Sequence, residues 1–351
     1  MTILAIALAL LIAMADHVSA CAVCVGFPGR TTADYLIEGH CVILARQHED
    51  NPFAYAPHEV LKGNFDGADI DLLVGSVTRR VLQADASRRV LLVQELPDGP
   101  WRNFGVASPD LESIVRRILV LSAMWKESGG REDRLRFFVP LFGHEERSIR
   151  ELAYLELARA PYPFIKRLGR VVAREDFASM LEQRQYLQWR SLAILLLAQS
   201  DDPQDKQRIL RSFRDAYRFG LKTNLAAWTA AAIEVEGESA IDFVEEHSFR
   251  RDDGEREHLE SVFTALSMVG TQSDSQVQDR IVLSYRTLLA HSPEFAPRIA
   301  DDLRRWNRTE LTSELSKLVE GANSLDFPDK QSIRKYLRAA ATSKDFMLVD
   351  E

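Results

Sequence analysis

The sequence is poor in cysteine and in excess positive charge, and its only long apolar run lies at the start. All three cysteines precede residue 42, which excludes the small disulfide-scaffold class. The net charge is −8 and the paired arginines are scattered, mostly beside acidic residues, so a nucleic-acid partner is not expected. After residue 20 no apolar run approaches the roughly 18 residues that a membrane span needs.

The motifs of common enzymes are also missing. The chain has no acyl-transfer nucleophile elbow, no P-loop and no dinucleotide fingerprint. His58-Glu59 and His144-Glu145 begin like the zinc-protease motif, but the second histidine is absent in both. Trp189 and Trp228 stand at apolar helical positions, which favours core packing. The sequence therefore assigns no catalytic residue and no cofactor, and predicts a non-enzymatic protein.

What is present is ordinary globular composition with a leader. With 351 residues, 46% hydrophobic and 27% charged, the chain is long enough for two domains. Thr2–Ala15 is almost uninterruptedly apolar, and small residues follow as far as Ala20. This layout predicts a signal peptide over residues 1–20, although no Lys or Arg precedes the apolar run. The mature protein is expected outside the cytoplasm, as a periplasmic, secreted or membrane-anchored protein.

The residues around the end of the predicted signal peptide predict lipidation as well as cleavage. Val18-Ser19-Ala20-Cys21 resembles the bacterial lipobox, and that resemblance implies that Cys21 carries a lipid. Any contact with a membrane would then be through this anchor alone. Ordinary cleavage after Ala20 is the open alternative.

Three arrangements of the cysteines are compatible with export. If Cys21 is lipidated, Cys24 and Cys41 are left to form a disulfide. Alternatively, Cys21 and Cys24 are a redox pair, although the following residues predict an extended segment and not the helix that such a pair needs. A zinc site of Cys21, Cys24, His40 and Cys41 is the third arrangement, but its spacing differs from common zinc sites. No metal ligand is therefore assigned.

Residues 21–107 are expected to form a small β domain. Short apolar and β-branched runs alternate with turn residues. Five strands in about eighty residues favour a closed OB-type barrel. The expected strands are 35–46, 53–61, 70–76, 79–82 and 89–96.

Three segments of this region resemble the netrin-like module that is shared with tissue inhibitors of metalloproteinases. They are 32–40 (TADYLIEGH), 58–63 (HEVLKG) and 89–93 (RVLLV). The resemblance implies an OB barrel that binds proteins. In those inhibitors the free amine and carbonyl of the first cysteine bind a protease zinc, a role that would come to Cys21 only if its amine is free. The chain departs from the family in having CxxC where the inhibitors have CxC, and in lacking their later cysteines.

Residues 108–340 are expected to be helical. Ser108-Pro109-Asp110 is a typical helix start, and 126–130 breaks the first helix from the next. Residues 150–158 recur as 190–198, with Arg, Leu and Ala in register, and 225–231 is a weaker third copy. Helix pairs with a period near forty resemble HEAT repeats over 131–249, with a compact helical bundle as the alternative. Residues 341–351 are expected to be a polar tail.

The sequence thus predicts an α+β protein of two domains, a small OB-like β-barrel followed by an all-α HEAT-like domain. Its predicted function is exported binding or scaffolding of a protein partner through the helical surface. Two alternatives stay open: inhibition of a metalloprotease through the amine of Cys21, and thiol-disulfide exchange by Cys21 and Cys24.

Overall fold

The computed structural model describes residues 30–67, 69–127, 130–250, 255–321 and 325–347, with side chains to residue 342. The described residues form two compact units, which join in the chain at Ala160–Pro161. We call residues 30–160 the sheet unit and those from Pro161 onward the helical unit. The change from strands to helices at 107–108, expected as the domain boundary, lies inside the sheet unit, because the helices that follow it pack with the sheet.

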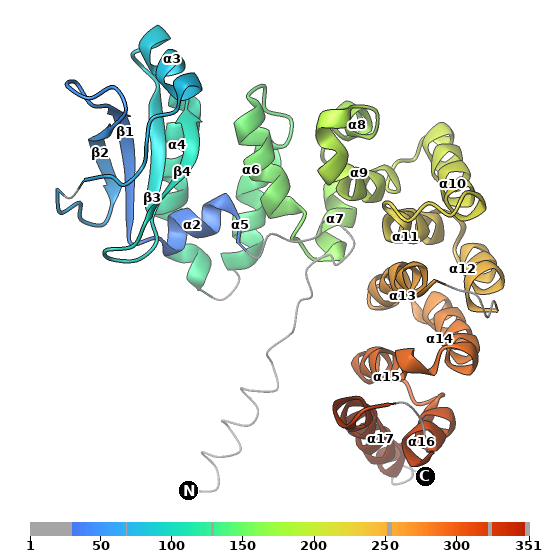
Figure 1. Cartoon of the computed structure of the whole chain (residues 1–351). Coiled ribbons are helices and arrows are strands. Elements are labelled where there is room, and N and C mark those ends of the chain that lie inside the picture. Colours follow the sequence, from blue (N-terminus) through green and yellow to red (C-terminus); the bar gives the residue numbers. More distant parts are fainter. Residues whose placement is uncertain (1–29, 68, 128–129, 251–254, 322–324, 348–351) are drawn as a thin grey trace, which may run out of the picture. The chain divides into compact units, whose positions relative to one another are not determined.

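Within the described residues, the sheet unit has one antiparallel sheet of four strands in the order β2-β1-β3-β4. Figure 1 shows it at the blue and cyan end of the chain. β2 and β4 are its edges. The strands are β1 (Cys41–Gln47), β2 (Tyr55–Lys62), β3 (Arg89–Gln94) and β4 (Trp101–Ala107).

Three of the strand predictions need correction. The expected strand 35–46 is helix α2 (Thr32–Glu38) followed by β1. Residues 70–75 form no strand beyond an isolated bridge at Leu73, and 79–82 lie in helix α3 (Ser76–Ala84). Val77, Val81 and Leu82 lie on one side of a helix, which explains why residues 79–82 are helical and not a strand. β4 was not predicted, whereas β2 and β3 lie where strands were expected.

Both faces of the sheet are covered near its centre. All residues from Cys41 to Ala45 are buried, which a strand shows only when both sides pack against protein. One face packs with Tyr55, Val74 and Trp101 into a hydrophobic cluster that Leu82 of α3 partly covers. The loop after β2 and helix α3 thus take the place that further strands were expected to fill.

Helices complete the sheet unit. α4 begins at Ser108 as predicted: the Ser108 Oγ accepts a hydrogen bond from the Leu111 amide at 3.1 Å. The predicted break after Lys126 is confirmed, since the next helix begins at Gly130. The bounds are α4 (Pro109–Leu121), η1 (Met124–Lys126), α5 (Gly130–Phe138), η2 (Val139–Leu141) and α6 (Arg147–Leu157).

The helical unit is a sequence of helices joined by turns. Its elements are α7 (Tyr162–Leu168), α8 (Arg174–Ala178), η3 (Ser179–Leu181), η4 (Arg184–Trp189), α9 (Arg190–Leu197), α10 (Pro203–Arg218), α11 (Leu225–Glu236), α12 (Glu238–Val244), the π-helical turn η5 (Glu245–Phe249), α13 (Arg256–Gly270), α14 (Ser275–His291), η6 (Pro293–Phe295), α15 (Ala296–Arg305), α16 (Thr312–Glu320) and α17 (Phe327–Met347). α17 therefore continues into the segment expected to be a polar tail.

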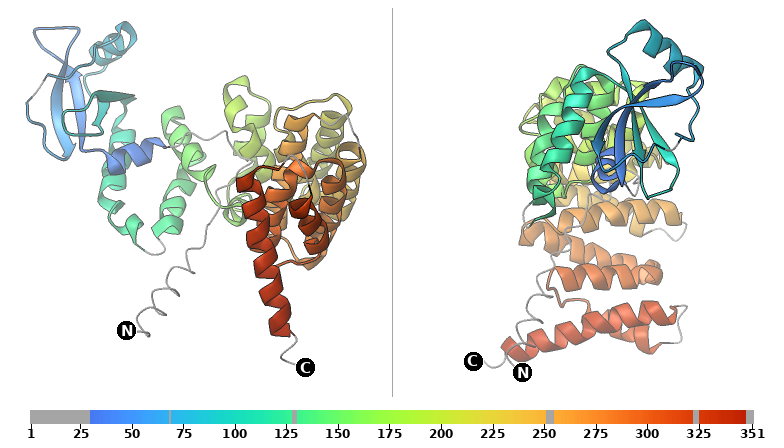
Figure 2. Two further views of the ribbon diagram at one scale, coloured as in Figure 1. Left: turned by 60° about the horizontal axis from the view of Figure 1, so that its bottom comes forward. Right: turned by 90° about the vertical axis from the view of Figure 1, so that its left-hand side faces the viewer.

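These helices form two layers. Figure 1 and Figure 2 show α11, α13, α15 and α17 stacked side by side, with α10, α12, α14 and α16 beside them. α11 contacts α9, α10, α12 and α13, and Ala227, Ala230 and Ala231 are fully buried there. Small side chains let neighbouring helices approach closely. Among the described helices, none is long and apolar enough to cross a bilayer.

Candidate functional site

Of the three cysteines, only Cys41 lies among the described residues. Cys21 and Cys24 lie outside the described residues, so the lipid anchor, the disulfide and the redox pair stay predictions. Cys41 is fully buried in β1, and burial raises the pKa of its thiol. Neighbouring His40 is exposed. Adjacent residues at the start of a strand point to opposite sides, which disfavours one zinc ion bound by both.

A cluster of charged side chains fixes helix α2. We call Thr31, Asp34, Arg134, Glu156 and Arg159 the Asp34 cluster. Thr31 caps α2: the Asp34 amide donates to the Thr31 Oγ1 at 3.2 Å, and the Thr31 amide donates to the Asp34 Oδ2 at 2.9 Å. This reciprocal pair is a capping box, which satisfies two helix-end donors at once.

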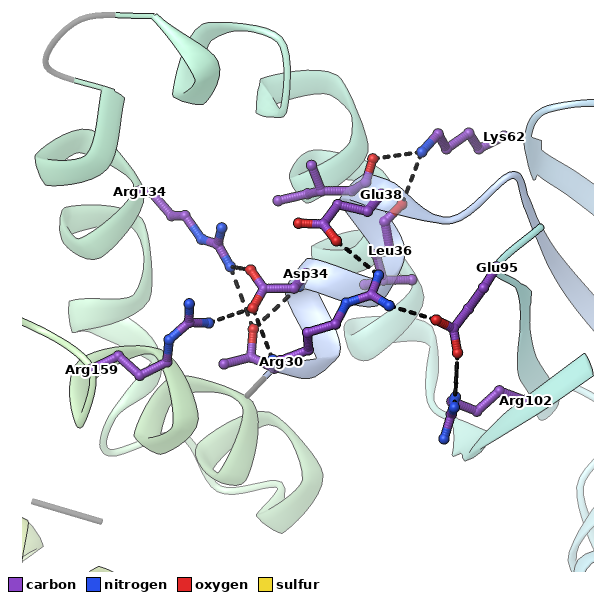
Figure 3. A network of polar contacts seen from close by, with 11 residues as sticks. Arg30, Asp34, Leu36, Glu38, Lys62, Glu95, Arg102, Arg134 and Arg159 are labelled. Carbon is purple, nitrogen blue, oxygen red and sulfur yellow. Dashed lines mark hydrogen bonds and ion pairs between the residues drawn. The ribbon is translucent and has the colours of Figure 1, made fainter. Parts of the chain in front are cut away.

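Two arginines from beyond the sheet complete the cluster (Figure 3). Arg134 of α5 donates to Asp34 at 2.6 Å and to both carboxylate oxygens of Glu156 at 2.8 Å. Arg159 donates to the other oxygen of Asp34, and the Thr31 hydroxyl donates to Glu156. Asp34 and Glu156 are 6% and 3% exposed, so both negative charges are buried and both are paired.

The electrostatics of the cluster indicate a structural role. Burial would raise the pKa of Asp34, but the Thr31 amide and the Arg134 and Arg159 charges outweigh it and hold that pKa below its ordinary value. A general acid or base needs a pKa near the working pH. Asp34 instead stays ionised, and its effect is to tie the start of the described chain to α5 and α6.

A second set of contacts fixes α2 to the sheet. Arg30 pairs with Glu38 at 2.8 Å and also with Glu95, which in turn binds Arg102. The Lys62 ammonium donates to the Ile37 carbonyl at 2.6 Å, a favourable place for a cation because it lies at the carbonyl end of the helix. Both ends of α2 are therefore held by charged groups (Figure 3).

The helical unit contains a hollow of about 590 Å³ with a distinctive lining. Its apolar side chains are Leu181, Leu221 and Trp228, and its cationic ones are Arg190, Arg208 and Lys222. We call it the cationic hollow, since no acidic side chain in the described part of the chain lines it. Trp228 was expected in the core but is only half-buried.

A neighbouring hollow differs in charge. It has a volume of about 360 Å³, shares Lys222 and Asn224 with the cationic hollow, and is lined on its far side by Glu257 and Glu260. Acids and bases are mixed there. The concentration of positive charge is thus confined to the hollow that contains Arg190.

The turn between α10 and α11 shapes the rim that separates the two hollows. Gly220 and Asn224 have φ angles of 61° and 59°, the left-handed region that glycine and asparagine tolerate best. The Ser191 hydroxyl donates to the Asn224 Oδ1 at 2.9 Å, and α11 has no side-chain cap. The turn leaves Leu221 and Lys222 exposed.

Arg190 is distinctive among the three cations. Its Nε is buried without a hydrogen-bond partner in the described part of the chain, and no carboxylate there forms an ion pair with it. Arg208 pairs with Glu182 at 3.4 Å. Lys222 pairs with Glu255 at 2.6 Å and with Glu257 at 3.1 Å, and all of these side chains are exposed. Sequence analysis missed this site, because its residues come from several elements and form no motif.

One serine–histidine contact lies apart from both hollows. His258 is half-buried, and its Nε2 lies 2.9 Å from the Ser248 Oγ. Ser248 is only 2% exposed, so a substrate carbonyl has no access to its hydroxyl. The contact joins the π-helical turn η5 to α13, and we assign it no chemistry.

Comparisons with known proteins identify no relative. No protein-family model matches the chain, and neither a curated protein nor a solved structure is similar to it.

Proposed function

We propose that this chain is an exported, non-enzymatic protein that binds a protein partner through its helical unit. The cationic hollow is the observation that carries the proposal. In a chain of net charge −8, a hollow lined by three basic and no acidic side chains among the described residues stands out electrostatically. Positive charge beside exposed apolar surface favours an acidic protein surface as the partner.

The arrangement of the helices supports this proposal. Stacked helix pairs offer an extended surface on which loops and rims recognise a partner. The three copies of the sequence repeat fall in α6, α9 and α11, and we propose that these helices belong to HEAT-like repeats. Ile149, Leu152, Ala153 and Leu157 of α6 are buried, as a stacked helix requires.

The sheet unit then serves as the attachment end. The signal peptide and the lipidation of Cys21 are both part of the proposal, and the Asp34 cluster supports it, since it fixes the first described residues that follow the predicted leader to α5 and Glu156 of α6. The netrin-like resemblance belongs to the proposal as well, as a resemblance to a protein-binding module. Closure into an OB barrel is not part of it, because β2 and β4 are the edges of the sheet in the described residues. The observations on the helical unit favour binding over the inhibitor and redox alternatives, which rest on Cys21 and Cys24 alone.

Site-specific photo-crosslinking in cells that naturally express the chain tests this function. A benzophenone amino acid replaces Ser212, which lines the cationic hollow, or Glu246, which is exposed on η5. We expect a discrete heterologous product from position 212, none from position 246, and loss of the product when Arg190→Glu is added. Identical products from both positions, or a product that survives Arg190→Glu, would contradict the proposal.

A further inference from the structure

The lining of the cationic hollow defines what fits it. Leu181, Leu221 and Trp228 form apolar walls, and the basic groups stand beside them. A simple anion would leave the apolar walls exposed to water, and a purely apolar group would leave Arg190 unpaired. A volume of about 590 Å³ is that of a site for a small ligand or a few side chains. The occupant must therefore be both acidic and apolar.

The existing ion pairs do not block such an occupant. The carboxylates that pair with Arg208 and Lys222 are themselves exposed, and exposed pairs are worth only about 0–1 kcal/mol. An incoming carboxylate can replace them at little cost. At Arg190 it replaces nothing, because that guanidinium has no carboxylate partner among the described residues.

One segment of this chain has the required chemistry. Residues 345–351 read Asp-Phe-Met-Leu-Val-Asp-Glu. Four consecutive apolar residues stand between acidic ones, and the three acids match the three cations of the hollow in number. We propose that the cationic hollow binds residues 345–351 of a second copy of the chain.

Geometry favours a second copy over the same chain. The stack runs from α11 through α13 and α15 to α17, and the three steps amount to about 24–30 Å at the usual spacing of packed helices. Residues 345–347 are the last turn of α17, and residues 348–351 reach about 14 Å at most beyond it. The segment therefore falls short of the hollow in its own chain.

Such a contact joins two different surfaces, the cationic hollow of one copy and the acidic segment of another. Each copy offers one hollow and one acidic segment, so binding leaves a free hollow at one end and a free segment at the other. Contacts of this kind build chains of copies unless the geometry closes a ring. The inference goes beyond the proposed partner, with which the segment would compete for the same hollow.

Peptide binding to the purified mature protein tests the contact without any partner. The probe is a fluorescein-labelled peptide of residues 343–351, and the receptor is the protein that lacks residues 345–351. We expect saturable anisotropy that weakens at least tenfold in Arg190→Glu and in Leu221→Ser. Arg211→Glu is the matched control, because Arg211 lies exposed on α10, which also carries Arg208, and does not line the hollow. A peptide with its acids replaced by Asn and Gln should not bind.

Sedimentation velocity of the complete mature protein then distinguishes the occupants. We expect association that increases with protein concentration and disappears both on deletion of residues 345–351 and in Arg190→Glu, while Arg211→Glu still associates. Unchanged circular dichroism establishes that Arg190→Glu is folded, and Leu221→Ser repeats the test at an already exposed side chain. The proposal is overturned if the peptide binds all variants equally or not at all. It is equally overturned if the complete protein stays monomeric at concentrations where the peptide binds, because the segment then does not bind a second copy.

Discussion

Two buried aspartates show how environment decides the effect of a single charge. Asp34 lies between two arginines and a helix-end amide, which outweigh burial and lower its pKa. Asp302 of α15 is 1% exposed and accepts from the Ser267 and Tyr285 hydroxyls at 2.7 and 2.8 Å. There, burial outweighs the hydroxyls and the Arg305 charge and raises the pKa. The two carboxylates should therefore respond to pH in opposite directions.

Replacing Asp34 by Asn should destabilise the sheet unit by about 2 kcal/mol at pH 7, since a hydrogen bond to a charged group contributes about 1.5–3 kcal/mol. The folded pKa of Asp34 lies below the unfolded value of about 3.9. The ionised group thus adds stability above that pH, and the stability is lost as the pH falls through the folded pKa. Urea denaturation at pH 7 and pH 3 should show the difference between wild type and variant shrinking at pH 3. Asp133→Asn, at an exposed position on α5, is the control and should cost almost nothing.

Replacing Asp302 by Asn should change stability by less than about 1 kcal/mol at pH 7, because removing a desolvated charge offsets the loss of its hydrogen bonds. The folded pKa here is raised, so ionised Asp302 is unfavourable at neutral pH. Wild type should gain stability relative to Asp302→Asn as the pH falls through the folded pKa toward about 3.9. The same denaturation series measures it, and a loss as large as that of Asp34→Asn would contradict this account.

At the scale of elements, local signals identified some boundaries and misled at others. The Ser108 cap and the break after Lys126 were predictable because they depend on a few adjacent residues. The capping box of Thr31 and Asp34 was an equally local sign of α2, but the apolar run that follows suited a strand as well. Leu73 and Val77 are apolar but exposed, so their hydrophobicity did not indicate a strand that packs on the core. The cationic hollow was beyond sequence reasoning, because Arg190 and Trp228 meet only after α9 and α11 have packed.

Enlarging a buried alanine in α11 should disturb the helix stack. Ala230 is fully buried in the helix that contacts four neighbours, and added methylene groups in a packed interior cost about 1–3 kcal/mol. Ala230→Leu should therefore lower the free energy of unfolding of the helical unit by that amount, measured by thermal unfolding. The matched change Ala339→Leu, at an exposed position on α17, should be neutral. Equal effects would mean that α11 is not tightly packed.

At the scale of the whole molecule, the chain consists of two units, each with its own core. Calorimetry of the protein should therefore resolve two transitions. Asp34→Asn should lower one by about 4–8 °C and leave the other unchanged, because about 2 kcal/mol corresponds to that shift in units of this size. Ala230→Leu should affect only the second. A single transition that moves with both variants would show that the units unfold together.

The hydrogen bonds and ion pairs around α2 also determine how this part of the chain resists a pulling force. If the leader's end is anchored, any tension on the protein enters at Arg30 and Thr31. Arg30 is bound to Glu38 and Glu95, and Thr31 to Glu156, so the pull is shared at once among α2, the sheet and α6. Bonds arranged in parallel must break together, whereas bonds in series unzip one at a time. The first described residues would thus resist being pulled away from the sheet and helices one contact at a time.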